Sequence, residues 1–488
     1  MFTTLFLKEI RETIQTYRFL VATVLCLSLL PLGMFVTTKS YESRLEQYRD
    51  ADRLYHQRAE GKLYRNFRAE GYRPPSWKSV FSGGLELYFP TKVVTSPDGR
   101  YEIVDDAGIP NPHSLLFGKV DYHFIVGFIL SLLALIYTFS TVSGEKETGT
   151  LRLILSNHVS RWKVITAKIF GSFVVFLMPF LVALIFTLLL FSFRSSIALF
   201  TGDSPAVLLV IFAATLLFMA ALFCLGALVS SLTYRSLTSM VTLLLIWVVF
   251  VLAIPKLSPM IAESMYPIKS PQVVQMEKEL ARENLYKELD TRRRELFERI
   301  MSDHGADYSG ISWPPQTEGA KRAYEQYDNE VVSLEKEYET QTTSALDRIE
   351  QDYEMKRRIQ ENIAVNLSRL SPLSCFTYIV TELSGTGLLE LRNIQDRARL
   401  FQQQVNEAVY DNYITKLYGN TTGNTSSSTS SADGYDPATT PVPHLTGYRH
   451  VTLVRALETV WVDIVLLTLY GILFFTGASV SFLRYDVR

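Results

Sequence analysis

The stretch SGEKETGTLRLILSNHVSRWKVITAK, residues 143–168, determines how the rest of the chain is organised. It is short and polar, and it lies between two long apolar runs, residues 125–142 and 169–193. Basic residues outnumber acidic ones in it: Lys146, Arg152, Arg161, Lys163 and Lys168 against Glu145 and Glu147. By the positive-inside bias, a short loop this rich in Lys and Arg lies in the cytoplasm between two membrane spans.

The middle of this loop, residues 150–156, predicts a short amphipathic helix. Leu151, Ile154 and Leu155 recur at helical spacing, and Arg152 lies on the other side. Such a helix is suited to binding a soluble protein. The alternative is a solvated loop whose leucines pack on the membrane surface, and spacing alone favours neither.

The loop also closely resembles the first cytoplasmic loop of ABC-2 type ABC transporter permeases. There the pattern is E-x-G-T-L-x-x-L-L-S-x-P-x-S-R, followed by a Lys that opens the next span. The resembling stretch begins at Glu145, and the residues that fit the pattern are Glu147, Gly149, Thr150, Leu151, Leu155, Ser156, Ser160, Arg161 and Lys168. His158 stands where the family commonly has Pro. The resemblance implies that this is a coupling helix, which docks into a groove on a separate ATP-hydrolysing subunit.

The composition of the 488 residues indicates a polytopic membrane protein, because six apolar runs alternate with strongly charged segments. The predicted spans are residues 19–37, 122–142, 169–193, 206–230, 238–254 and 460–482. The net charge of −1 comes from interspersed charges, so nothing points to nucleic acid. Cys26, Cys224 and Cys375 suggest neither an external disulfide nor a metal site.

We expect no Asp, Glu, Lys, Arg or His within the second to fifth spans, residues 122–142, 169–193, 206–230 and 238–254. Ion-coupled carriers normally place ionisable groups in their spans. Their absence from these runs predicts that the energy for transport comes from elsewhere.

Residues 1–18 predict an amphipathic helix lying in the membrane interface, with Phe2, Leu5, Phe6, Ile10 and Ile14 on one side. ABC-2 type permeases begin with such an elbow helix. The alternative is a signal peptide with residues 19–36 as its apolar core. That run is long for a signal peptide, and no small-x-small cleavage site follows it.

Two large segments lie outside the membrane in this reading, residues 38–120 and 255–459. In the first, Tyr41, Leu45 and Tyr48 predict that the helix of the first span continues outward. Gly- and Pro-rich turns and short apolar runs then predict a few strands in a small mixed lobe.

The second segment contains a predicted antiparallel helical hairpin, residues 272–370, with apolar residues at heptad spacing. The predicted packing residues are Leu285, Leu289, Leu296, Tyr324, Val331, Leu334 and Tyr338. We expect any single one of these residues to do no more than hold the hairpin together. A functional role would belong to the whole helical hairpin. Residues 363–393 predict a helix at the outer membrane surface or against the spans. Residues 418–445 predict a flexible linker, whose Asn-x-Ser/Thr triplets are glycosylation sites or chance matches.

No motif indicates a catalytic site. Gly144 and Gly149 have the glycine spacing of a P-loop, but no Lys follows the second Gly. Neither H-E-x-x-H nor G-x-S-x-G is present. The chain is therefore expected not to be an enzyme and to carry no cofactor, with ATP and Mg bound by the partner ATPase.

The predicted fold class is an all-α polytopic membrane protein: six transmembrane helices and an elbow helix, with an external helical hairpin and a small mixed lobe. The predicted function is that of a permease subunit of an ATP-driven exporter in the plasma (inner) membrane, with both termini cytoplasmic. The expected partners are two cytoplasmic ABC ATPase subunits, a second copy or a homologous permease, the lipid bilayer and an external protein.

Two other hypotheses stay open. In one, the chain is a mechanical transmitter that passes ATP-driven motion to an external partner and moves no substrate across the bilayer. In the other, it is an envelope anchor or scaffold without an ATPase, and the match of the coupling loop counts against this.

Overall fold

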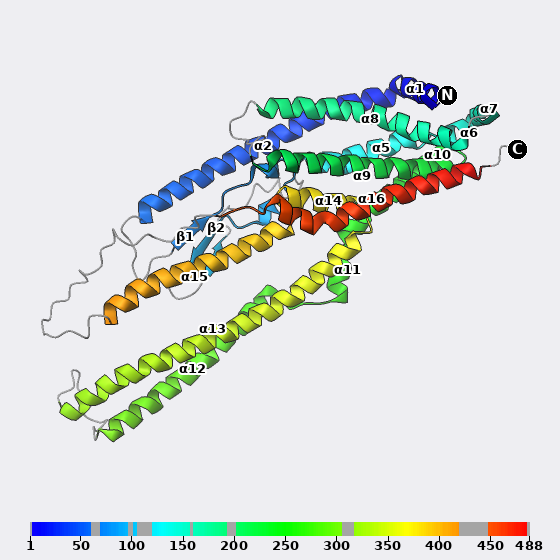
Figure 1. The fold of residues 1–488 in the computed structure, drawn as a ribbon. Helices are drawn as coiled ribbons and strands as arrows, with labels where there is room; N and C mark the ends of the chain where they lie inside the picture. Colours follow the sequence, from blue (N-terminus) through cyan, green and yellow to red (C-terminus); the bar gives the residue numbers. More distant parts are fainter. Residues whose placement is uncertain are drawn as a thin grey trace. The chain divides into compact units, whose positions relative to one another are not determined.

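The structure is a computed structural model that describes residues 2–59, 69–95, 101–104, 120–156, 160–192, 202–304, 317–418 and 448–485. It divides into two compact units (Figure 1). Unit 1 comprises Met1–Pro255 with Arg369–Arg488, and unit 2 comprises Lys256–Ser368.

Six helical stretches among the described residues are long and apolar enough to cross a membrane. They are Tyr17–Gln57, Tyr122–Thr148, Arg161–Ser192, Ser204–Leu232, Ser236–Met265 and Leu453–Leu483. Together with the short strands of a single small sheet, they confirm the predicted all-α polytopic fold.

Two of these stretches run furthest beyond the apolar runs that predicted them. After α1 (Phe2–Ile14), helix α2 (Tyr17–Ala59) continues well past residue 37. The fifth stretch comprises α10 (Ser236–Trp247), the π-helical segment η4 (Val248–Ala253) and α11 (Ile254–Met265), and it passes residue 254. Hydrophobicity marks where a helix leaves the membrane, whereas the helix ends only where its backbone hydrogen bonds end.

The second span opens with α4 (Tyr122–Phe124), the π-helical η3 (Ile125–Leu130) and α5 (Ser131–Thr138). The predicted range 122–142 contains His123, so this span does carry an ionisable side chain at its start. His123 Nε2 lies 2.9 Å from Thr377 Oγ1, and the imidazole stacks on Phe376. The expectation is therefore wrong for the start of the second predicted span, of which residues 125–142 contain no ionisable side chain.

The core of unit 1 forms around α9 (Ser204–Leu232) and α14 (Pro372–Leu383). Helix α14 packs against α9 and against α16 (Leu453–Leu483), and the ring of Phe376 stacks on Phe218 with 4.7 Å between centroids. Apolar residues occupy most sides of α14, and such a helix must be buried rather than laid on a surface. Of the two placements predicted for residues 363–393, α14 takes the one against the spans.

Helices α9 and α5 approach each other very closely. A Cβ added at Gly226 would lie 1.8 Å from Thr138 Oγ1 and 2.6 Å from its Cβ. Glycine at this position is therefore what lets the two backbones pack together.

Paired polar groups hold the two ends of α14. Before its first residue, the Arg369 guanidinium donates to both carboxylate oxygens of Asp463 on α16, at 2.7 and 2.9 Å. Beyond its last turn, Glu382 accepts from the backbone N–H of Leu389 at 3.2 Å, in the first turn of α15 (Leu388–Tyr418). Burial raises the pKa of Glu382 to about 7.

A small lobe completes unit 1. Strands β1 (Ala69–Tyr72), β2 (Lys92–Thr95) and β3 (Tyr101–Val104) form an antiparallel sheet in the order β1-β2-β3. Helix α15 packs on this sheet: Phe401 and Val405 share a buried cluster with Ala69 and Val93.

The start of α15 is tied to the segment that leads into α16. Glu390 is buried and accepts from Tyr448 Oη at 2.6 Å, from the backbone N–H of Val451 at 3.1 Å, and contacts His450 Nδ1 at 2.8 Å. These hydrogen bonds and the neighbouring imidazole outweigh burial and lower the pKa of the Glu390 carboxyl.

Unit 2 is built around two long helices, α12 (Pro271–Asp303) and α13 (Glu318–Ser368). Leu289 and Tyr338 are buried in it, and the other predicted packing residues are half-buried: Leu285, Leu296, Tyr324, Val331 and Leu334. Ion pairs cross between the helices: Lys278 with Glu350, Arg293 with Glu335, and Arg299 with Glu330. The predicted turn of the hairpin and most of the predicted linker fall at residues 305–316 and 419–447, outside the described residues.

Candidate coupling site

The loop between the second and third spans folds into two short helices, α6 (Ser143–Thr148) and α7 (Thr150–Ser156). They lie at the end of unit 1 that also holds α1 and the last turn of α16 (Figure 1). Gly149 separates them with φ of +76°, a left-handed conformation that favours glycine. It caps α6 and sets the change of direction between the two helices.

Glu145 attaches α6 to a charge cluster around the buried Lys168. The ammonium of Lys168, on α8 (Arg161–Ser192), lies 2.7 Å from Glu145 Oε1 and 3.4 Å from Glu9 Oε2 on α1. Ser172 Oγ donates to the other oxygen of Glu9 at 3.1 Å. Lys168 is only 7% exposed, so its charge depends on these two carboxylates.

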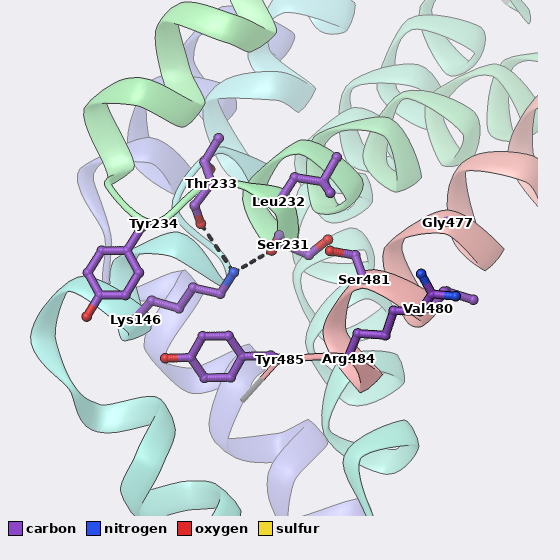
Figure 2. A pocket seen from close by; sticks show the side chains of 10 residues that line it. All are labelled: Lys146, Ser231, Leu232, Thr233, Tyr234, Gly477, Val480, Ser481, Arg484 and Tyr485. Atoms are coloured by element: carbon purple, nitrogen blue, oxygen red, sulfur yellow. Dashed lines mark hydrogen bonds between the residues drawn. The ribbon is translucent and has the colours of Figure 1, made fainter. Parts of the chain in front are cut away.

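Lys146 attaches α6 to the end of α9. Its ammonium donates to the backbone carbonyls of Ser231 and of Thr233, the latter at 3.2 Å (Figure 2). The same ammonium lies 5.0 Å from the centroid of the Tyr485 ring, just after α16, within cation–π range. Lys146 is buried at this junction.

Glu147 attaches α6 to the start of α10. Its Oε2 accepts from the backbone N–H of Ser236, the first residue of α10, at 3.0 Å. A carboxylate is favourable there because the first N–H groups of a helix have no partner within the helix. In addition, Ser230 Oγ on α9 accepts from the backbone N–H groups of Val142 and Ser143 at 3.0 Å. Three consecutive side chains of α6 thus connect it to α1, α8, α9 and α10.

Helix α7 turns its apolar side inward. Leu151 is fully buried in the core of unit 1, and Ile154 and Leu155 pack against that core half-buried. Arg152 and Leu153 face outward, with Leu153 69% exposed. The prediction that Leu151 forms a docking surface needs correction, because the chain's own spans already bury this side chain. What α7 offers to a partner is the outward side, with Arg152 and Leu153.

Arg161, also predicted to dock, contacts the chain itself. Its Nη1 donates to the carbonyls of Leu483 at 2.7 Å and Tyr485 at 2.9 Å, at the end of α16. A cation is favourable at these carbonyls because they have no partner within the helix.

The structure also places the other predicted coupling residues of this loop. Thr150 and Ser160 are exposed, and the carbonyl of Ser160 accepts from the backbone N–H of Lys163. Ser156 is the last residue of α7. Residues 157–159 lie outside the described residues.

Sequence reasoning missed Glu9, Lys146, Ser230 and Tyr485. Lys146 lies between Glu145 and Glu147, both predicted coupling residues, and this position alone could have indicated that Lys146 belongs to the same site. Glu9 lies on the polar side of the predicted elbow helix, where nothing in the sequence distinguishes it from Lys8 or Glu12. Within the described parts of the chain, no group of three or more His, Cys, Asp or Glu residues could hold a metal ion.

Six apolar helical stretches and this end of unit 1 define a multi-pass membrane protein. A family model described as "ABC-2 family transporter protein" matches residues 3–487, and the chain therefore belongs to the ABC-2 transporter family. Members of this family are membrane permease subunits of ABC transporters and not ATPases. The comparison with curated proteins finds no match.

We expect Lys168→Met to destabilise the purified protein strongly. It leaves the carboxylates of Glu9 and Glu145 without their cation, and breaking a buried pair in this way costs about 3–5 kcal/mol. The apparent midpoint of thermal unfolding in detergent, followed by tryptophan fluorescence, measures the effect.

Two further variants separate this cause from a general packing defect. Lys8→Met breaks only the exposed contact with Glu12 and should change the midpoint little. Adding Glu9→Gln and Glu145→Gln to Lys168→Met removes both carboxylate charges that lack a cation. The midpoint of thermal unfolding should then rise back toward that of the wild type. Equal midpoints for Lys168→Met and Lys8→Met would show that the cluster does not hold α1 and α6.

Proposed function

We propose that this chain is the permease subunit of an ATP-driven exporter in the plasma membrane, and that α6 and α7 couple it to a separate ABC ATPase. The single observation that carries this proposal is the attachment of residues 145–147 to several helices of unit 1. A force applied at α7 would reach those helices through buried ionic and backbone contacts rather than be absorbed by a flexible loop.

The ATPase would contact the outward side of α7. Arg152 and Leu153 are exposed there, and a partly apolar groove would accept the Leu153 side chain while a carboxylate at its rim pairs with Arg152. ATP and Mg would be bound by two ATPase subunits, and the permease would work with a second copy or a homologous permease. ATP binding would close the ATPase pair and tilt the spans through α6.

The orientation follows from the charges. The end of unit 1 with α1, α6 and α7 carries most of the basic residues of the short loops, among them Arg152, Lys163 and Arg235. By the positive-inside bias, these charges support a cytoplasmic location for this end, and with it for both termini. With this orientation, the segment after the fifth predicted span, residues 255–459, would be external.

Thiol labelling tests this orientation directly. The native cysteines, Cys26, Cys224 and Cys375, are all buried, so background labelling should be low. In intact cells, a membrane-impermeant maleimide should label Tyr286→Cys on α12, which replaces a 57% exposed side chain. It should label Leu153→Cys only after permeabilisation. The reverse pattern would invert the orientation and remove α7 from the cytoplasm.

Docking is tested by purifying the tagged full-length chain from its native membranes and measuring ATP hydrolysis in the eluate. Leu153→Asp should abolish the activity that co-purifies, because a carboxylate entering an apolar groove is desolvated at a cost of several kcal/mol. Arg152→Glu should weaken it. Both side chains are exposed, so the permease itself should stay folded.

Arg235→Glu is the matched control, since Arg235 is an exposed cation at the same end of unit 1 but lies outside α7. It should retain the co-purifying activity. Wild-type levels of ATP hydrolysis with Leu153→Asp would contradict docking at α7.

The second candidate function is that of a mechanical transmitter, and the observation that favours it is unit 2. This unit is compact on its own, with a buried cluster of Ile300, Met301 and Ala323 and with ion pairs between its two long helices. A self-supporting helical pair of this length is more than closing a pore requires. It would pass ATP-driven motion to an external protein, and no substrate would cross the bilayer.

Replacing residues 272–368 by a Gly/Ser linker separates the two functions. An exporter should keep both ATP hydrolysis and the growth phenotype of the wild type. A transmitter should keep ATP hydrolysis but lose the phenotype, together with any external protein that co-purifies. Wild-type growth of the deletion strain would therefore exclude the transmitter.

A further inference from the structure

A cavity of about 520 Å³ lies at the end of unit 1 that holds α6, beside the junction of α9, α10 and α16 (Figure 2). Its lining comes from three segments: Lys146 from α6; Ser231, Leu232, Thr233 and Tyr234 from the end of α9 and the turn after it; and Gly477, Val480, Ser481, Arg484 and Tyr485 from the end of α16.

The lining is cationic. Lys146 and Arg484 both belong to it, and no carboxylate occurs among its described residues. The contrast with Lys168 is informative, because that buried ammonium lies between two carboxylates. Among the described residues, the recorded contacts of the Lys146 ammonium are two backbone carbonyls and the Tyr485 ring. Carbonyl and ring contacts orient the Lys146 charge without neutralising it, so an anion in the cavity would be attracted to it.

Hydroxyl groups add hydrogen-bonding capacity beside these charges. Ser481, Tyr234 and Tyr485 line the cavity and can donate to acceptor oxygens. Two cations with several hydroxyl donors suit a phosphate group, which presents several acceptor oxygens and a negative charge.

The apolar part of the lining indicates where the rest of the ligand lies. Val480 is 47% exposed, and Leu473, two helical turns earlier on α16, is 56% exposed. Gly477 lies between them on the same side and lines the cavity, and a Cβ added there would lie 3.1 Å from Leu228 Cδ1 on α9. An exposed apolar stripe on a membrane span is suited to contact with acyl chains, and Val480 connects this stripe to the lining of the cavity.

We propose that the cavity binds the phosphate of an anionic membrane lipid, with the phosphate at Lys146, Arg484 adding positive charge at the rim beside Val480, and the acyl chains following α16 past Val480 and Leu473. Basic cavities at the ends of membrane helices are typical sites for anionic headgroups. Because Lys146 is also an anchor of α6, a lipid bound here would hold α6 against α9 and α16. The proposal does not depend on which ATPase docks at α7.

The test is native mass spectrometry of the purified full-length protein titrated with phosphatidylglycerol and, separately, with phosphatidylcholine. We expect tighter binding of phosphatidylglycerol. Arg484→Gln should weaken it about fivefold, the contribution of one basic residue near an anionic lipid. Arg484 is exposed, so this variant should fold normally.

Arg235→Gln is the matched control, because it removes an exposed cation from the turn next to the cavity without touching the lining. It should leave the affinity for phosphatidylglycerol unchanged. Lys146→Gln should weaken binding as well, and thermal unfolding of this variant will show whether α6 has stayed attached. Equal affinity for the two lipids, or equal losses with Arg484→Gln and Arg235→Gln, would overturn the proposal.

A competition arm distinguishes a lipid from a soluble phosphate. Glycerol 1-phosphate is a soluble phosphate monoester without acyl chains, and it should not displace phosphatidylglycerol at matched concentration. Val480→Ser removes part of the apolar lining and should weaken lipid binding further. Displacement by glycerol 1-phosphate at matched concentration would assign the cavity to a soluble anion and overturn the lipid assignment.

Discussion

The ammonium of Lys168 lies between the carboxylates of Glu9 and Glu145, and the arrangement of α1, α6 and α8 depends on this contact. Lys168 is buried and both carboxylates are half-buried, so leaving one of these charges without its partner would cost several kcal/mol in desolvation. The contact therefore orients α1 and α6 against α8. It also sets where the neighbouring side chains Lys146 and Glu147 reach α9 and α10.

Buried contacts continue from α6 toward the other end of unit 1. Helix α9, which receives Lys146 at its end, packs along α16 and stacks Phe218 on Phe376 of α14. Helix α14 in turn is held to α16 by the ion pair of Arg369 with Asp463. Packed helices transmit displacement because protein interiors are dense and compress little. This continuity gives the proposed coupling a physical route through unit 1.

Different surfaces of the same end of unit 1 serve different proposed partners. In these proposals, the outward side of α7, with Leu153, binds an ATPase, whereas the cavity lined by Lys146 and Arg484 binds a lipid phosphate. Lys146 links the two, because it belongs to the helix that precedes α7 and also lines the cavity. Unit 2 has its own core and cross-helix ion pairs, so its role can be separated experimentally from both.

The sequence by itself determined the elements of this protein, because hydrophobic run length and helical spacing are local properties. It predicted the six spans, α1, the two long helices of unit 2 and the coupling loop at residues 143–168. Only the tertiary structure decided what these elements contact. The spacing of Leu151 and Leu155 indicates an amphipathic helix, but it does not tell whether the apolar side packs on another protein or on the chain's own spans. In the structure, Leu151 is buried in the chain's own core. Likewise, Glu9 and Lys168 are separated by more than 150 residues, and no local pattern records which buried charge meets which. Pairing over such a separation depends on how the helices pack together, which spacing along the sequence does not encode.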